Sequence, residues 1–162
     1  MNPCPCGHLG DDRFGCSCTN QLIERYRGRI SGPLLDRIDL HVEVPALSLR
    51  DLRSLPGEPS AAVAARVAAA RQRQLARFGP DAPATINAAM TAPSLRRHCA
   101  LDAAGQRLLD AAFDKLGLSA RALDRIVKVA LTIADLAGAR AIHPAHLAEA
   151  IQYRALDRRI SV

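Results

Sequence analysis

The chain has 162 residues and a formal net charge of +6, which suits one domain of ordinary size or a small lobe plus part of another. Hydrophobic residues make up 49% and aromatic residues 3%, so closely packed helices are favoured over a β-sandwich or barrel. The basic charge is almost entirely Arg, which suits phosphate recognition but is equally typical of a solvated helix face. Neither a membrane span nor a signal peptide is evident, so a cytoplasmic protein with no membrane partner is expected.

Residues 1–19 are rich in Cys, Gly, Pro and Asp and have no periodicity, which predicts a loop. Four cysteines in this loop have the spacing C-x-C-x₉-C-x-C: Cys4, Cys6, Cys16 and Cys18. Two thiolate pairs on a flexible loop can supply the four soft ligands that zinc binds tetrahedrally. The pairs are tighter than the usual C-x₂-C, so free or oxidised thiols are the alternative, and His8 is a substitute ligand. Cys99, far from this loop, is expected to be a buried apolar residue.

The next part of the chain predicts short elements. Thr19 or Asn20 can cap a helix over about residues 21–29, and Ser31-Gly32-Pro33 starts a brief second one. Apolar residues then alternate with polar ones over residues 38–44, which predicts a half-buried strand ended by Pro45. One strand cannot make a sheet, so its partner strands are expected upstream of this chain.

A boundary is expected at residues 56–60, PGEPS, after a short helical turn that begins near Ser48. The remainder predicts a bundle of about four or five helices over residues 60–156. The helices are expected at about residues 60–78, 93–99, 102–116, 119–137 and from 143 onward. Ser60, Asp102 and Ser119 are expected to cap three of them, and Gly117 is expected to end the helix over residues 102–116. Their expected inner faces include Val63, Val67 and Phe113, whereas Arg77 is expected to face outward.

Five blocks of sequence occur in a recognisable order: NPCPCG, RISGPLLDRIDLHVEV, ARQRQLARFG, LSARALDRIVKVALTIADLAG and HLAEAIQYR. In order and spacing they resemble the ComM/YifB family of magnesium-chelatase-like AAA+ ATPases, over nearly the whole chain. That family is similar to the ATPase subunit of magnesium chelatase and, more distantly, to the MCM helicases, all of which act as rings.

The resemblance implies a mainly α fold. Residues 56–162 would form the helical AAA+ lid, and residues 1–55 would be a C-terminal remnant of the α/β AAA+ core carrying one strand. The GxxxxGK[ST] phosphate loop and the acidic Mg-binding motif would precede Met1, because neither occurs in this chain. ATP and Mg are therefore expected only in the intact parent, and the chain alone is expected not to hydrolyse ATP.

Three residues take roles from the resemblance. Asn2 resembles the sensor-1 Asn that orients the attacking water, Arg37 resembles an arginine finger that reaches a neighbouring subunit's phosphate, and Arg121 resembles the sensor-2 Arg that contacts nucleotide in its own subunit. Arg29 is the second choice for the finger.

Each role has a structural alternative. Asn2 could be a terminal polar residue, Arg37 could pair with Asp36 or Asp39, and Arg121 could be an ordinary surface residue.

As the resemblance implies, the parent would be a hexameric ring that moves DNA strands, because ComM members are branch-migration helicases of natural transformation. Its partners would be its own N-terminal ATPase core, neighbouring subunits and DNA. One alternative is a motor for inserting magnesium into protoporphyrin, and another is a helical interaction module with no catalytic role. The cysteine loop looks like a ComM/YifB feature and favours the first reading.

Overall fold

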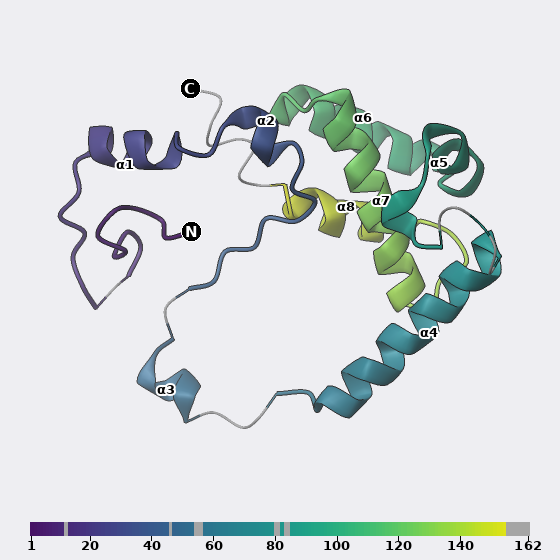
Figure 1. The fold of residues 1–162 in the computed structure, drawn as a ribbon, viewed down its shortest axis with the longest axis horizontal. Coiled ribbons are helices and arrows are strands. Elements are labelled where there is room, and N and C mark those ends of the chain that lie inside the picture. Colours follow the sequence, from purple (N-terminus) through teal and green to yellow (C-terminus); the bar gives the residue numbers. More distant parts are fainter. Residues whose placement is uncertain (12, 46, 54–56, 80–81, 83–84, 155–162) are drawn as a thin grey trace.

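The computed structural model in Figure 1 describes residues 1–11, 13–45, 47–53, 57–79, 82 and 85–154, and helices are the only regular secondary structure among them. The helices, in chain order, are α1 (Asn20–Arg27), α2 (Gly32–Leu35), α3 (Leu49–Leu52), α4 (Ser60–Phe78), the 3-10 turn η1 (Asn87–Ala89), α5 (Ala92–His98), α6 (Ala103–Leu116), α7 (Ala120–Leu136) and α8 (Pro144–Gln152). We call residues 60–154 the helical domain and residues 1–53 the N-terminal region. The predicted bundle end at residue 156 and part of the PGEPS boundary lie outside the described residues.

The core of the helical domain is built around α7, which packs against α4, η1 and α8, while α6 packs against α8. The largest apolar side chains that are almost completely buried in it are Ile126 of α7 and Leu147 of α8. Alanines fill much of the remaining space, including Ala122, Ala130 and Ala150. The prediction of helices packed closely through small residues is therefore confirmed.

The caps predicted at Asp102 and Ser119 are confirmed, whereas the cap predicted at Ser60 is wrong, because Ser60 is the first residue of α4 and Pro59 takes the capping position. Asp102 accepts a hydrogen bond from the Gly105 amide at 2.7 Å, and Ser119 accepts one from the Ala122 amide at 3.1 Å. Such caps satisfy amides that have no partner inside the helix. At the other end of α6, Gly117 takes the left-handed conformation with φ of 61°, which ends the helix as predicted.

The predicted strand at residues 38–44 is wrong for this structure, because these residues are extended but have no strand partner among the described residues. The His41 amide instead donates to the carbonyl of Tyr153, at the end of α8, at 2.8 Å. A β-ladder needs a second extended chain beside the first. Without one, the alternating apolar side chains stay exposed, up to 86% at Val44.

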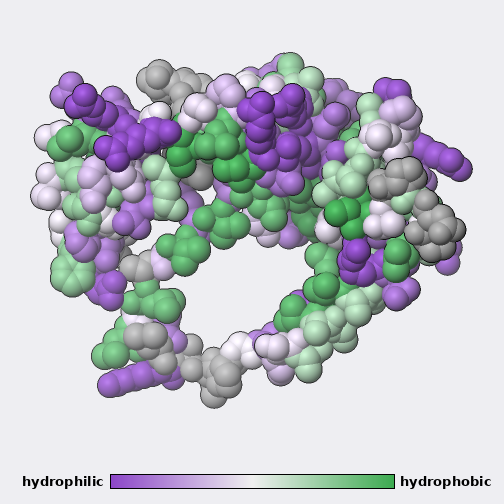
Figure 2. All heavy atoms as spheres, viewed as in Figure 1, coloured by the Kyte–Doolittle hydropathy of each residue, from purple (hydrophilic) through white to green (hydrophobic). Residues whose placement is uncertain are grey.

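Two predicted inner faces are only partly correct. Val63 and Val67, in the first half of α4, are exposed, and burial on this helix begins only at Ala70. Figure 1 shows why: the first half of α4 runs beyond the other helices. Phe113 of α6 is also 41% exposed rather than buried. Apolar residues of α4 and of the extended segment border an opening in the molecule (Figure 2).

Arg77, predicted to face outward, instead points into the domain. Its guanidinium makes two hydrogen bonds to Asp135 of α7, at 2.5 and 2.9 Å, and one to Asn87 of η1 at 2.7 Å. The Asn87 side-chain amide also donates to Asp135 at 2.8 Å. Asp135 is nearly inaccessible to water, so its charge requires this pairing, and the network fixes α4 and η1 to α7.

Among the described residues, no helix combines the length and the apolar character needed to cross a membrane.

Candidate functional site

The first candidate site is the cysteine loop, residues 1–19, which Figure 1 shows on the opposite side of the molecule from α7. A turn closed by a hydrogen bond from the Gly7 amide to the Cys4 carbonyl, at 3.1 Å, folds the loop back on itself. Gly7 has φ of 86°, a conformation that side chains other than glycine rarely adopt. Arg27 of α1 donates to the Pro3 carbonyl at 3.1 Å and so attaches the loop to the helix that follows it.

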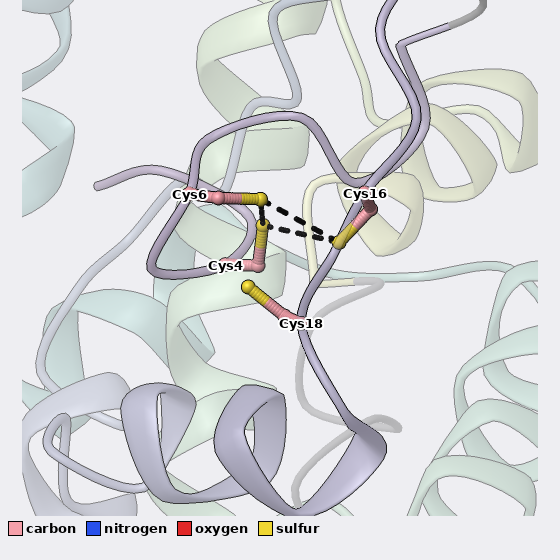
Figure 3. Close-up of side chains that lie close together, drawn as sticks. All are labelled: Cys4, Cys6, Cys16 and Cys18. Atoms are coloured by element: carbon pink, nitrogen blue, oxygen red, sulfur yellow. Dashed lines mark hydrogen bonds between the residues drawn. The ribbon is translucent and has the colours of Figure 1, made fainter.

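The four predicted cysteines converge from the two arms of this loop (Figure 3). Their sulfur atoms all lie within 4.8 Å of one another. The Sγ atom of Cys4 is 3.3 Å from that of Cys6 and 3.7 Å from that of Cys16, and Cys6 and Cys16 are 3.6 Å apart. Four sulfur atoms around one zinc ion, at Zn–S distances of about 2.3 Å, would be about 3.8 Å apart. The geometry therefore fits a tetrahedral thiolate site.

The thiols influence one another's protonation. Backbone hydrogen bonding from His8, together with the Cys4 thiol, lowers the pKa of Cys6 to about 6. A backbone hydrogen bond from Cys6 lowers the pKa of Cys18, but burial and the neighbouring thiols outweigh it and raise this pKa to about 12. One proton thus leaves the cluster readily and another is retained, as expected of close, interacting acids.

His8, the substitute ligand, and Cys99, the fifth cysteine, take no part in this cluster. The His8 side chain does not join the four sulfur atoms, and its ring centre lies 5.2 Å from that of Phe14. Cys99 is buried in the helical domain, as predicted, and burial raises its pKa to about 11. A thiol with so high a pKa is a poor nucleophile at neutral pH.

Asn2 lies in the same loop and is exposed, with its side-chain nitrogen close to Gly7. Figure 1 shows the N-terminal end of the chain apart from α7, the helix that carries Arg121. Asn2 and Arg121 are therefore not brought together by the described residues, and the sensor-1 role of Asn2 stays a prediction.

Arg37 follows α2 and is exposed, and its Nη1 donates to the carbonyl of Pro33 at 2.8 Å. The neighbouring carboxylates face the helical domain instead of Arg37. Asp39 pairs with Arg125 of α7, and Asp36 lies 3.8 Å from Arg154. The finger role stays a prediction, but the alternative of a pair with either neighbouring aspartate does not describe this structure.

Arg121 is the second residue of α7 and is exposed, one turn before Arg125. The start of a helix directs free amides and a partial positive charge outward, which favours an anion near an arginine placed there. Arg29, the second choice for the finger, is exposed and lies over the ring of Tyr26 at 5.7 Å. No local pattern indicates that Arg125 and Arg154 contact the segment around Arg37, because both contacts join residues far apart in the chain.

A helical domain, preceded by a segment with an exposed arginine and by a four-cysteine loop, is consistent with the helical lid of an AAA+ ATPase and part of the region before it. Comparison with family models agrees. The model described as "Magnesium chelatase, subunit ChlI C-terminal" matches residues 57–154, and the one described as "Magnesium chelatase, subunit ChlI" matches residues 1–52. The chain therefore belongs to the magnesium chelatase subunit ChlI family, in its ComM/YifB branch.

Relatives within the family support this assignment. The "Competence protein ComM" of Haemophilus influenzae is 44% identical over 160 residues, and the "Uncharacterized protein YifB" of Escherichia coli K12 is 41% identical over 160 residues. A Mycobacterium tuberculosis protein is 38% identical over 153 residues. The first two matches cover 98% of this chain but 30% of each relative, so the chain spans less than a third of their length.

Proposed function

We propose that this chain is part of an ATP-driven AAA+ ring, a hexamer working in the cytoplasm, that moves DNA strands during competence and recombination. The observation that carries the proposal is the similarity to the competence protein ComM, 44% identical across 98% of this chain. An excess of arginine gives the chain a net charge of +6, which suits a phosphate-backbone partner. The remainder of the protein would supply the phosphate-binding loop and the Mg ligands.

Within that ring, two exposed arginines would act on nucleotide. Arg37 would reach the terminal phosphate bound by a neighbouring subunit, where a guanidinium stabilises charge that spreads over the oxygens during transfer. Arg121, in the first turn of α7, would contact the phosphates bound by its own subunit. Asn2 would orient the attacking water.

Mixed rings test these roles in the full-length protein, with DNA-stimulated ATP hydrolysis as the measurement. Arg37→Ala and Arg121→Ala are each expected to lower turnover by about 10³-fold or more, the scale of an arginine finger. An Arg37→Ala subunit should regain hydrolysis at its own nucleotide when its neighbour supplies a normal Arg37. An Arg121→Ala subunit should stay impaired beside any neighbour. Normal turnover in both variants would refute the proposal and make both arginines surface residues.

The family description favours one alternative, a motor for inserting magnesium into protoporphyrin. The two functions predict different stimulators of the full-length ATPase. Branched or single-stranded DNA should raise turnover if the first proposal is correct, and should have no effect on a chelatase motor. If neither DNA nor porphyrin partners alter turnover and no hydrolysis is detected, the chain is a helical interaction module.

We also propose that Cys4, Cys6, Cys16 and Cys18 bind zinc, which would hold the two arms of the cysteine loop together. The support is the mutual approach of the four sulfur atoms. Elemental analysis of protein purified without chelators should find about one zinc per chain, lost in Cys16→Ser and retained in the matched Cys99→Ser variant. A folded wild-type protein without zinc would show that the cysteines are free or oxidised thiols.

A further inference from the structure

Arg154, which follows α8, is a fully buried charged residue with an unusual set of partners. Its Nη1 donates to the Ile38 carbonyl, and its Nη2 lies 3.8 Å from the Asp36 carboxylate. The preceding residue, Tyr153, accepts a hydrogen bond from the His41 amide at 2.8 Å. Burying an unpaired guanidinium costs free energy, so the contacts with residues 36–41 stabilise Arg154 in its buried position. The same contacts hold these residues against the end of α8. We call residues 36–41 the docking segment.

The docking segment is held from a second direction by α7. Asp39 pairs with Nη1 of Arg125, which is half-buried on this helix. Arg125 is one helical turn after Arg121, so the two arginines project from the same side of α7. The segment is thus joined to the end of α8 through Arg154 and Tyr153, and to the start of α7 through Arg125.

Arg37 lies inside the docking segment, between the two aspartates that these contacts hold. Its own side chain turns back to the Pro33 carbonyl and leaves both aspartates to the helical domain. We infer that Arg125 and Arg154 are positioning residues, which fix Arg37 relative to α7 and thereby link it to Arg121. The inference rests on the proposed roles of Arg37 and Arg121 in ATP hydrolysis.

The link has a functional consequence, because Arg121 and Arg125 belong to one rigid helix. Nucleotide contacted by Arg121 in one subunit shifts α7, and the Asp39 pair carries that shift to Arg37, which serves the neighbouring subunit. Misplacing a group that acts on the transition state by about 1 Å can lower the rate by about 10²-fold. The nucleotide sites of adjacent subunits are then coupled through the docking segment, because nucleotide bound at either site can shift its position.

Hydrogen exchange in the present chain tests the docking without any assumption about activity. The probe is the His41 amide, which is protected by the Tyr153 carbonyl. Asp39→Arg and Arg125→Asp should each raise its exchange rate on the order of tenfold, and the double reversal should return it toward the wild-type rate. Asp39→Asn, a milder change, should give an intermediate rate. The exposed Arg107→Ala on α6 is the control and should change nothing, and the Ile126 amide reports whether each variant remains folded.

ATP hydrolysis by the full-length protein tests the positioning role. Each single reversal should lower kcat about tenfold or more with little change in KM for ATP, because the bound nucleotide keeps its own contacts while the finger is displaced. The double reversal should recover most of the lost kcat, because it restores the ion pair with its charges exchanged. If each residue acted only through its own charge, kcat would not recover. Arg107→Ala should hydrolyse ATP normally.

The outcomes separate the inference from the proposed function. If Arg37→Ala hydrolyses ATP normally, the finger role fails and the positioning inference fails with it. If Arg37→Ala is impaired but the single reversals hydrolyse ATP normally, only the positioning inference is overturned. It is equally overturned if exchange at His41 is the same in all folded variants, or if the double reversal is as impaired as the single ones.

Discussion

The helical domain and the N-terminal region both contain many apolar residues, but the two regions differ in how far these residues are buried. In the helical domain, Ile126 and Leu147 are at most 1% exposed, whereas in the N-terminal region Phe14 is 55% and Val44 86% exposed. A helix satisfies its backbone hydrogen bonds within itself and needs only another helix to cover one face. An extended segment needs a partner for its backbone as well. The helices can therefore bury their apolar faces against one another, whereas the extended segment leaves its apolar side chains exposed.

The N-terminal region is held together instead by polar groups. Its elements are the cysteine loop, the contact between Arg27 and Pro3, and the docking segment bound to Arg125 and Arg154. Such contacts fix positions with little apolar burial. They also make the region sensitive to changes that would leave the helical core intact.

The largest loss of stability in the helical domain is expected from Arg77→Ala. Removing the guanidinium leaves the carboxylate of Asp135 buried without its charged partner, which should lower the free energy of unfolding by about 3–5 kcal/mol. Urea denaturation measures this loss, with Arg73→Ala as the control, since Arg73 is exposed on the same helix. A loss no greater than that of the control would show that Asn87 and water replace the pair.

The next largest effect should come from Leu147→Ala, which creates a cavity beneath α7 and α6. The expected loss is about 2–5 kcal/mol by urea denaturation. The matched change in the N-terminal region, Val44→Ala, removes an exposed side chain and should alter stability by no more than about 0.5 kcal/mol. Similar losses from the two changes would mean that the extended segment is covered in solution.

A smaller effect is expected from Ser119→Ala, which removes the hydroxyl that caps α7. The expected loss is about 1 kcal/mol, the usual contribution of such a cap. Ser60→Ala provides a control, because Ser60 is the first residue of α4 and the capping position before it belongs to Pro59. Equal stabilities of the two variants would contradict the cap at Ser119.

The smallest effect on the helical domain is expected from removing the proposed zinc. Dialysis against a strong chelator should raise hydrogen exchange at the Gly7 amide, whose turn joins the first pair of cysteines. Exchange at Ile126 should stay the same, because no cysteine of the loop contributes to the helical core. If both amides lose protection together, the two regions do not fold independently.

Much of the helical domain was determined by local sequence. Asp102 and Ser119 cap helices where they were expected to, and Gly117 ends α6 in a left-handed conformation, because these effects involve residues within one or two turns. The clustering of the cysteines was also predictable, since each pair is closely spaced and both pairs belong to one short loop. The family resemblance came from ordered blocks of sequence and needed no coordinates.

Only the tertiary structure decided how distant segments meet. The 3.6-residue period placed Val63 on a face of α4 but could not tell that this half of the helix extends past α7. It also could not tell that Arg77 would find Asp135, 58 residues away in the chain. The alternation at residues 38–44 predicted a half-buried strand, yet whether such a segment pairs as a strand depends on a neighbour that no local pattern contains. The same holds for Arg125 and Arg154, because the role of a charged side chain depends on the partner that folding brings to it.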